Sequence, residues 1–417
     1  MEPRQERGLE IARRSAIWQE RGFWIVPAQS KPAGRYRVVT GDEPWCNCPD
    51  FEIRGTKCKH IFAVEYFLEF RKTGDGSTAV TETVQITKRP SYPQNWPAYN
   101  EAQTSEKKMF QSLLHDLCAG IPEPTQSKGR PRIPLRDAVF AATFKIYSTF
   151  SGRRFMSDLE QAQSRGFIKH LPHYNSIFNY LESPELTAIF TSLITRSALP
   201  LKAIETDFAV DSTGFMTSRF TRWFDAKYGV VKQEHDWVKA HIMCGVKTNV
   251  VTAVEIHGQH ASDSPLLPTM LARTAENFTV KEVSADKGYS SIRNLESVLS
   301  INATPYIAFK SSTTGESRNS AWDKMFHYFS FNRDEFFAHY HKRSNIESTV
   351  MMIKTKFRDH VRSKTDTAMK NEVLGKILCH NICCIISAIY ELGISPVFWP
   401  EPNCPKTLTA AQKPALS

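Results

Sequence analysis

The chain has 417 residues, of which 41% are hydrophobic and 23% are charged. This balance is that of soluble globular proteins, so it excludes wholesale disorder and leaves room for roughly two to four domains. The 53 Lys and Arg residues outnumber the 43 acidic residues, which gives a net charge of +10 and a pI near 9.1. Such a chain favours an anionic partner, most often nucleic acid, although a basic enzyme without a polyanionic partner remains the alternative.

The first part of the chain predicts a small module and a linker. Residues 1–75 contain a short basic helix, a strand at 35–39, a cysteine cluster and an amphipathic helix at 60–70. Residues 76–103 contain Gly, Ser and three prolines, a composition that is typical of a linker between domains.

Beyond the linker the pattern changes twice. Apolar residues recur at helical spacing through residues 104–200, which predicts a helical region, and its basic segment favours DNA binding. Residues 201–393 mix strands and helices, and we expect the Pro-rich tail 394–417 to be poorly ordered. The strands are expected at 203–211, 237–246, 250–257, 280–286 and 304–309, and the helices at 266–275, 291–299, 334–358 and 367–390.

Neither end of the chain resembles a targeting or membrane segment. The first 14 residues are rich in charge, and the apolar stretch 377–390 is short and contains polar residues, so it is expected to be a buried core helix. Three of the nine cysteines lie within 13 residues, which favours a metal site in a reducing compartment over a disulfide framework. We therefore expect a soluble intracellular protein with no membrane partner, cytoplasmic and nucleoid-associated if it is prokaryotic.

The cysteine cluster has the composition of a structural zinc site. Cys46 and Cys48 are one residue apart, and Cys58 and His60 follow after nine residues with the same spacing. Four Cys and His ligands with no open position are typical of tetrahedral Zn²⁺, whereas chance clustering of free thiols is the alternative. We place the first pair on a strand and the second pair at the start of a helix. The order resembles that of the SWIM zinc finger over residues 35–70, which implies an accessory module that binds DNA or protein.

A second cysteine group has a different context. Cys379, His380, Cys383 and Cys384 lie on the apolar C-terminal helix. Free Cys is among the most buried residue types and packs as a small hydrophobe. Core packing is therefore the favoured interpretation, and a metal site is the alternative.

Four polar residues form a stripe on one predicted helix. Tyr340, Arg343, Glu347 and Lys354 are offset by 3, 7 and 14 residues, so at about 100° per residue they share one face. This helix stripe suits a site for metal ions and phosphates, with Glu as an oxygen ligand and the cations on a nucleic-acid backbone. A solvated helix face with scattered charges is the alternative.

Two predicted strands each end in an acid that would join the stripe. Asp211 follows an apolar strand and is expected to point to the same face as Asp207, and Asp286 ends a second strand. Three acids from two strands and a helix are what a two-metal phosphoryl-transfer site needs. Asp207 is expected to be structural, and Asp263, which precedes a helix, is expected to be an N-cap.

Together these residues resemble a known enzyme family. The helix stripe has the spacing of the Y-R-E-K signature of DDE insertion-sequence transposases, and the segments around Asp211 (AVDSTGF) and Asp286 (ADKGY) are similar to their first and second acid blocks. The resemblance spans residues 127–393. It implies an α/β fold with a ribonuclease-H-like catalytic domain, a mixed sheet with flanking helices.

The resemblance also implies the chemistry and the roles of single residues. Asp211, Asp286 and Glu347 would hold two Mg²⁺ or Mn²⁺ ions for cleavage at transposon ends and strand transfer into target DNA. The 61 residues from Asp286 to Glu347 leave no room for a large inserted β domain, so a hairpin mechanism is not favoured. The DNA contacts that it implies are Tyr289, Tyr340, Arg343 and Lys354.

Further DNA contacts are expected before the catalytic domain. Lys128, Arg130 and Arg132 surround a Gly and a Pro and resemble an AT-hook core, which lies in the minor groove, although a solvated basic linker fits equally well. Asn175 and Asn179 would suit one face of a recognition helix.

We therefore predict a DDE transposase with structural Zn²⁺, two catalytic divalent ions and DNA as its partner. Pairing of two ends implies a homodimer during the reaction. The alternatives are a nuclease of the same fold without strand transfer, and a transposase-derived DNA-binding protein, which would be marked by loss of an acid.

Overall fold

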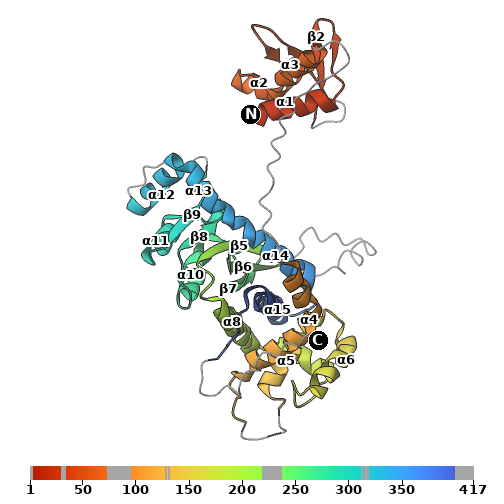
Figure 1. Cartoon of the computed structure of the whole chain (residues 1–417), viewed down its shortest axis with the longest axis vertical. Coiled ribbons are helices and arrows are strands. Elements are labelled where there is room, and N and C mark those ends of the chain that lie inside the picture. Colours follow the sequence, from red (N-terminus) through yellow and green to blue (C-terminus); the bar gives the residue numbers. More distant parts are fainter. Residues whose placement is uncertain are drawn as a thin grey trace, which may run out of the picture. The chain divides into compact units, whose positions relative to one another are not determined.

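The computed structural model describes residues 3–29, 34–72, 95–126, 129, 132–217, 237–310, 313 and 319–399. The chain divides into two compact units, Met1–Tyr92 and Pro93–Ser417 (Figure 1). Each unit buries a hydrophobic core of its own.

The first unit is a four-stranded antiparallel sheet packed against helices. The strands follow one another in the order β1-β2-β3-β4, and α3 packs against β2, β3 and α1. Arg21 and Gly22 have positive φ angles of 50° and 86° and form the two-residue turn of the β1–β2 hairpin, which the sequence analysis missed. The elements are α1 (Pro3–Arg14), β1 (Trp18–Glu20), β2 (Phe23–Pro27), β3 (Arg35–Val39), β4 (Trp45–Cys46), α2 (Pro49–Arg54) and α3 (Lys59–Lys72).

The second unit begins with five helices, as the sequence predicted for residues 104–200. The first of them starts at Trp96, inside the segment predicted to be a linker. Asn95 caps it, since its side chain accepts a hydrogen bond from the backbone N–H of Ala98 at 3.3 Å, and Pro97 lies in its first turn. Proline is compatible with that position, so here it marks a helix start and not a loop. The five are α4 (Trp96–Ala119), α5 (Leu135–Ser148), α6 (Gly152–Ser164), α7 (Tyr174–Leu181) and α8 (Pro184–Ala198).

A mixed five-stranded sheet forms the centre of the second unit (Figure 1). Its order is β7-β6-β5-β8-β9: β5, β6 and β7 are antiparallel neighbours, and β8 and β9 run parallel to β5. This is the mixed sheet expected of a ribonuclease-H-like domain, with β5 in the middle. The strands are β5 (Asp207–Met216), β6 (Trp237–Gly245), β7 (Val251–Gly258), β8 (Glu282–Ala285) and β9 (Thr304–Ile307).

Six helices of the described residues accompany this sheet. The helix predicted at 334–358 is divided, because a 3₁₀ turn at His341–Arg343 separates α13 from α14, and α12 was not predicted. Between Asp286 and Glu347 the described residues contain a single strand, β9. The helices are α10 (Leu267–Ala275), α11 (Ile292–Ser300), α12 (Ser320–Phe331), α13 (Arg333–Tyr340), α14 (Ser344–Phe357) and α15 (Asp366–Leu392).

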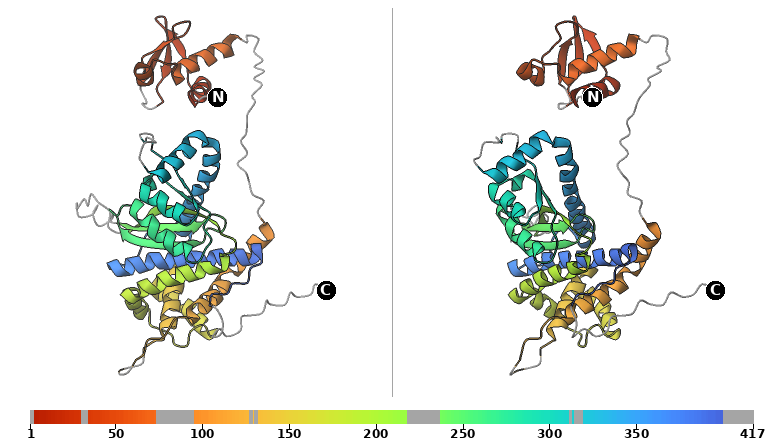
Figure 2. Two further views of the ribbon diagram at one scale, coloured as in Figure 1. Left: turned by 90° about the vertical axis from the view of Figure 1, so that its left-hand side faces the viewer. Right: turned by 60° about the vertical axis from the view of Figure 1, so that its left-hand side comes forward.

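Helix α15 joins the helical region to the sheet. It packs against α4, α5 and α8 on one side and contacts β6 and β7 on the other (Figure 2). Among the described residues it is the one helix long and apolar enough to cross a membrane, but 72% of its most apolar window is buried within the molecule. It is therefore the core helix that the sequence predicted.

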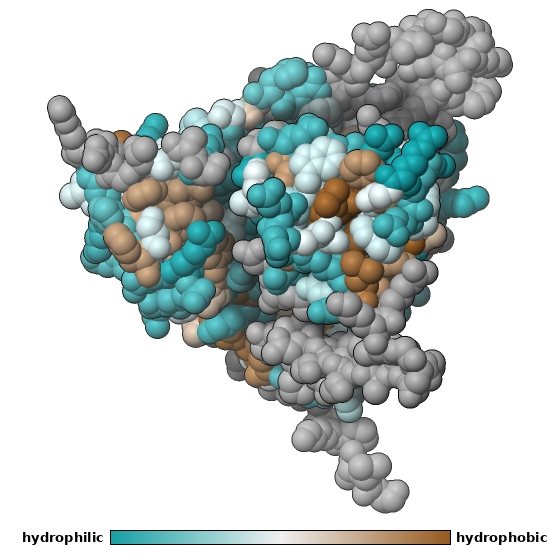
Figure 3. Space-filling view, turned by 90° about the horizontal axis from the view of Figure 1, so that it is seen from above, coloured by the Kyte–Doolittle hydropathy of each residue, from teal (hydrophilic) through white to brown (hydrophobic). Residues whose placement is uncertain are grey.

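The surface seen in Figure 3 is mixed in polarity, and the C-terminal end departs from expectation. On the face seen in Figure 3, small apolar patches lie among hydrophilic residues, and the most exposed large apolar side chain described is Phe331, at 81%. Trp399, at the start of the predicted tail, is packed: its Nε1 donates to the carbonyl oxygens of Asp116 and Leu117 at 3.2 Å. Residues 400–417 lie outside the described part of the chain.

Candidate functional site

The four predicted zinc ligands converge in the first unit. One ligand atom from each of Cys46, Cys48, Cys58 and His60 lies within 4.8 Å of the others, and all four residues are buried. Nδ1 of His60 is 3.9 Å from the Cys46 Sγ and 3.8 Å from the Cys58 Sγ. Zn–S bonds of about 2.3 Å and a Zn–N bond of about 2.0 Å at a tetrahedral angle would place such atoms about 3.6 Å apart. The arrangement therefore fits tetrahedral Zn²⁺.

The local structure that presents these ligands differs partly from the prediction. Cys46 ends strand β4, but Cys48 is not on the strand: it is the N-cap of the short helix α2, where its Sγ accepts from the backbone N–H of Phe51 at 3.4 Å. Cys58 directly precedes α3, and His60 lies in its first turn. The ring of Tyr36 stacks on His60 with the centroids 4.4 Å apart, a contact that the ligand spacing alone did not reveal.

The thiols are already polarised toward metal binding. A hydrogen bond from the Cys46 thiol lowers the pKa of Cys58 to about 4, and His60 contributes in the same direction. The same interaction raises the pKa of Cys46. A bound cation would replace the shared proton, because the thiolate is the form of Cys that binds metal.

The register of the sheet in the second unit brings two of the three acids together. The sequence predicts that Asp211 ends its strand. In the structure it does not, because β5 continues to Met216 and remains paired with β6. However, β5 pairs with β8 only as far as Val210, opposite Ala285. Asp211 and Asp286 are thus the next residues on two neighbouring parallel strands, and their side chains belong to the same face of the sheet.

The third acid approaches from α14 through an arginine. Arg343 donates to the Asp211 Oδ2 at 3.0 Å and to the Glu347 Oε1 at 2.7 Å. The Arg343 side chain is 21% exposed and that of Glu347 60%. In this structure Arg343 therefore bridges two of the acids, and its predicted contact with DNA phosphate stays a prediction.

Burial and charge act on Asp211 in opposite directions. Burial raises its pKa, and Asp286 adds to this, while the backbone N–H of Ser212 and the Arg343 guanidinium lower it. The Ser212 N–H donates to the Asp211 Oδ1 at 2.8 Å, and the Lys287 N–H donates to the Asp286 Oδ1 at 2.5 Å. Both carboxylates are thus fixed by the backbone that follows them.

A second ionic bridge lies beside the first. Lys342 Nζ contacts the Asp207 Oδ2 at 2.8 Å and the Glu282 Oε2 at 2.7 Å, and Nδ1 of His339 lies 2.9 Å from the Glu282 Oε1. Asp207 and Glu282 are register partners on β5 and β8. The contacts of Asp207 agree with the structural role predicted for it.

The other predicted DNA contacts differ in accessibility. Tyr340 is half-buried, with its ring 6.3 Å from that of Phe336. Lys354 is also half-buried and lies 5.5 Å from the centre of the Phe215 ring. Tyr289 is 1% exposed, so the structure contradicts its predicted contact with DNA: η3 (Lys287–Tyr289) turns its ring into the core.

The basic segment before the catalytic domain is described only in part. Lys128 and Arg130 lie outside the described residues. Arg132 is exposed, and its backbone N–H donates to the Gln126 Oε1 at 3.0 Å. The predicted minor-groove contact of the three residues therefore stays a prediction.

The donor chemistry of the three acids fits divalent cations. Among the residues that the structure describes, the zinc set alone has three or more ligand atoms within 4.8 Å of one another, so Asp211, Asp286 and Glu347 do not converge on a single point. Instead the Arg343 guanidinium lies between two of them as a stand-in cation. Hard carboxylate oxygens on both sides of a positive charge are suitable for Mg²⁺ or Mn²⁺.

A polar pair behind the acids escaped the sequence analysis. Asp263 occupies the N-cap position of η2 (Ser264–Leu266), as predicted, but its side chain makes no capping bond. It pairs with Lys239 at 2.6 Å and lies 3.2 Å from Nδ1 of His241, which is fully buried. His241 is the register partner of Ser212, so it lies on the face of the sheet opposite Asp211. Alternation along the predicted strand at 237–246 was the available signal.

The second cysteine group is part of the core. Cys379 and His380 are buried on α15. Nε2 of His380 lies 2.9 Å from the backbone oxygen of Asn249, to which it donates, and 3.3 Å from the Cys384 Sγ. Burial lowers the pKa of His380 to about 4 and raises that of Cys384. Within the described residues this group forms no metal cluster, in agreement with core packing.

Comparison with known families matches both units. The model of the family described as "Transposase DDE domain" matches residues 202–382, which include all three acids, and that of the SWIM zinc finger matches residues 36–69. No curated protein and no solved structure matches the chain. A domain of this kind implies transposase activity, DNA binding and use of divalent metal, and the finger implies zinc. The chain thus carries a transposase DDE domain together with an N-terminal SWIM zinc finger.

Proposed function

We propose that this protein cleaves DNA at transposon ends and joins the cut strand to target DNA, with Asp211, Asp286 and Glu347 as its catalytic acids. The observation that carries the proposal is the register of the sheet. In this register Asp211 lies beside Asp286 on one face of the sheet, and Glu347 accepts a hydrogen bond from the same Arg343 guanidinium as Asp211. The match to a transposase DDE domain over the same residues supports it.

The three carboxylates would hold two Mg²⁺ or Mn²⁺ ions. When bound, such ions clamp the attacking and leaving oxygens of the phosphodiester and neutralise the developing charge. Asp211 and Asp286 are held for this purpose by the sheet and by the backbone N–H groups of Ser212 and Lys287. Asp211 and Glu347 become available once Arg343 leaves them.

The reaction needs no covalent enzyme intermediate. Water attacks the phosphorus at the transposon end, the bond to the 3′ oxygen breaks, and that oxygen takes up a proton. The freed 3′-hydroxyl then attacks a phosphodiester of the target, loses its proton and displaces a second 3′ oxygen. Arg343, released from the acids, and Lys354 would hold phosphates near the scissile bond, with Tyr340 beside them.

The other parts of the chain would serve DNA handling. The helices at 104–200 and the basic segment with Lys128, Arg130 and Arg132 would contact DNA, and the zinc module would add a DNA or protein contact. Pairing of two ends would need a homodimer. The protein would act in the cytoplasm, at the nucleoid in a prokaryotic cell.

A joining assay tests the proposal. Purified protein is incubated with labelled candidate ends, a supercoiled target plasmid and Mn²⁺ or Mg²⁺. The expected products are cut ends and strand-transfer products on a gel. Pre-cut ends separate the rival nuclease, which would cleave but not join. A transposase-derived DNA-binding protein would shift the ends without either product.

A further inference from the structure

A partly cationic pocket in the second unit is not explained by the catalytic acids. It has a volume of about 400 Å³ and lies where α5, α6 and α7 meet the segment between α14 and α15. One wall is apolar and includes Phe178. Three cationic side chains, Lys145, Arg362 and Lys364, line the remainder together with hydroxyl groups and the carboxylates of Glu182 and Glu372.

Lys145 is the most unusual residue of this pocket. It is only 9% exposed, and its ammonium group makes no hydrogen bond or ion pair with any residue that the structure describes. Its Nζ lies 5.8 Å from the centre of the Phe178 ring. Burial lowers the pKa of Lys145, Glu372 opposes this, and Arg362 adds to it. A buried cation without a partner is costly, so the site would gain from an anion.

The start of α6 adds positive potential to the same pocket. Ser151 is its N-cap but makes no side-chain capping bond, so the first N–H groups of this 13-residue helix are not capped by its hydroxyl. Gly152 allows the Phe178 ring to lie close to the start of α6, since a Cβ at this position would be 2.8 Å from the Phe178 Cζ. Helix N-termini bind phosphate through such N–H groups and the helix dipole.

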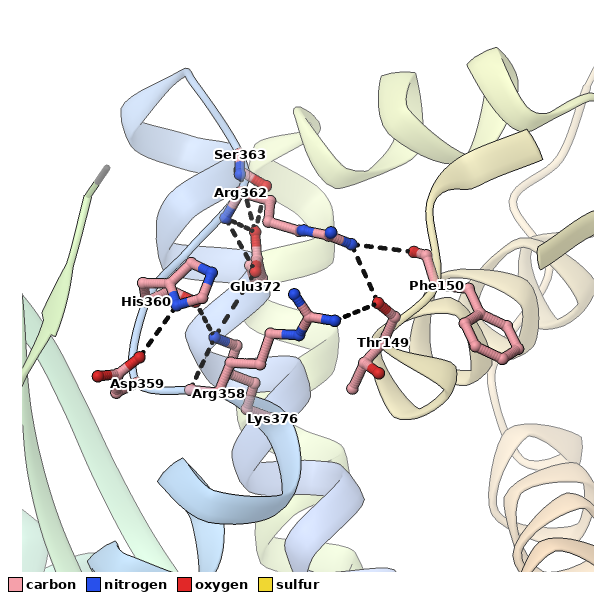
Figure 4. Close-up of polar contacts among 9 residues, drawn as sticks. All are labelled: Thr149, Phe150, Arg358, Asp359, His360, Arg362, Ser363, Glu372 and Lys376. Atoms are coloured by element: carbon pink, nitrogen blue, oxygen red, sulfur yellow. Dashed lines mark hydrogen bonds and ion pairs between the residues drawn. The ribbon is translucent and has the colours of Figure 1, made fainter. Parts of the chain in front are cut away.

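The segment that carries Arg362 and Lys364 is held in place by polar contacts (Figure 4). Arg362 donates to the carbonyl oxygens of Thr149 and Phe150 at 3.0 and 3.2 Å. Glu372 accepts from the backbone N–H groups of Arg362 and Ser363, at 2.9 Å to one of its oxygens in each case, and from the Ser363 hydroxyl. The negative charge of Glu372 is therefore already compensated within the protein.

The same segment is also tied to the strand that carries the first acid. The N–H of Met216 donates to the Asp359 oxygen at 3.1 Å, and the N–H of Val361 donates to the Met216 oxygen at 2.9 Å. Met216 lies five residues beyond Asp211 on β5, which is about 17 Å along a strand. That is about half a turn of B-DNA at 3.4 Å per base pair. The segment that leads into the pocket is therefore attached to β5 about half a turn of B-DNA from Asp211.

We propose that this pocket binds a backbone phosphate of DNA, with Lys145 as the cation at its base and Lys364 at its mouth. The identity of the ligand as DNA rests on the proposed function, whereas the phosphate chemistry follows from the pocket.

Salt dependence of DNA binding tests the proposal. The full-length, zinc-loaded protein is titrated into a fluorescent 30-base-pair duplex without Mg²⁺ or Mn²⁺, from about 50 to 300 mM NaCl. Removal of one lysine–phosphate interaction should reduce the slope of log affinity against log salt by about 0.9. Lys145→Met should show this reduction and bind about tenfold more weakly at the lower salt. Lys324→Met, which removes an exposed lysine of α12 outside the pocket and outside the helical region at 104–200, should change affinity less than twofold.

The outcomes separate this proposal from the proposed function. If the wild type binds DNA and a folded Lys145→Met retains its slope and affinity, the pocket is not a phosphate site. If Lys145→Met fails to fold, the exposed variant Lys364→Met decides, with a smaller expected loss of about threefold. Absence of DNA binding by the wild type would instead refute the proposed function. Stabilisation by inorganic phosphate that Lys145→Met abolishes, with DNA binding unchanged, would assign the pocket to free phosphate and overturn the proposal.

Discussion

Glu347→Gln separates catalysis from stability in a single substitution. The Glu347 side chain is 60% exposed, and its partner Arg343 lies one helical turn before it. Exposed pairs at this spacing contribute about 0.3–0.5 kcal/mol, so the loss of charge should lower the melting temperature by only about 1–2 °C. The glutamine keeps the size and shape of the side chain, and the fold should be unaffected.

Activity should respond very differently. The amide oxygen is a poorer ligand for Mg²⁺ than a carboxylate, and loss of one preorganised electrostatic group at a reacting centre costs about 10²- to 10³-fold in rate. Both cleavage of labelled ends and joining of pre-cut ends should therefore fall by about that factor. DNA binding should persist, because removal of a negative charge relieves repulsion of phosphate.

Two comparisons control this experiment. Asp211→Asn and Asp286→Asn should lose both activities in the same way as Glu347→Gln. Asp207→Asn, on the same face of β5 but paired with Lys342, should retain measurable activity. Cleavage by Glu347→Gln at a rate near that of the wild type in Mg²⁺ would show that the helix stripe is only a solvated face and refute the mechanism.

Two further predictions concern metal and pH. Cys58→Ala should lose bound zinc and unfold the first unit while the second stays folded, since structural zinc contributes about 10 kcal/mol or more to such modules. Elemental analysis measures the bound zinc, and circular dichroism measures the unfolding. Wild-type protein that contains no zinc would contradict the zinc assignment. Burial lowers the pKa of His241 from 6.5 to about 4. As the pH falls, His241 is therefore protonated in the unfolded chain before it is protonated in the folded protein. The contribution of neutral His241 to the free energy of unfolding is present above pH 6.5 and should fall by about 2 kcal/mol at pH 5. Urea unfolding at pH 7.5 and 5 should show this loss of stability. His241→Gln should lose about 2 kcal/mol less between the two pH values than the wild type. An equal pH dependence of the variant and the wild type would contradict the assignment to His241.

The order of most elements could be predicted, and candidate acids could be named, because both depend on local patterns. Strands β6 and β7 and helices α10 and α11 lie within two residues of the ranges expected from apolar periodicity. The spacing of the helix stripe is a property of the sequence alone, as is the C-x-C and C-x-H pattern of the zinc site.

The end of β5 illustrates what local patterns miss. The sequence predicts that the strand ends at Asp211, before the small and polar residues Ser212, Thr213 and Gly214. They are strand residues, because they pair with His241, Ala240 and Lys239 of β6 even after β8 has ended. The length of a strand is set by its longest neighbour, and that information lies elsewhere in the chain.

Side-chain partners between distant elements were equally hidden. Tyr289 has a sequence context that resembles an acid block of the family, yet its ring is buried, and Asp263 has the position of a cap, yet it pairs with Lys239. Trp399 lies in the segment predicted to be a poorly ordered Pro-rich tail, yet the Arg196 guanidinium lies 4.7 Å from the centre of its ring. Each outcome depends on which surface another element presents at that point.

The 3₁₀ turn before α14 links these observations to the chemistry. Consecutive residues of a 3₁₀ turn point about 120° apart. The long side chains of Lys342 and Arg343 nevertheless reach Asp207 and Asp211, two acids four residues apart on one face of β5. Lys342 thereby anchors the turn on Asp207, and Arg343 lowers the pKa of Asp211, which burial raises. In the proposed mechanism the guanidinium would give way to divalent cations at Asp211 and Glu347, while Lys342 would keep the helix in place.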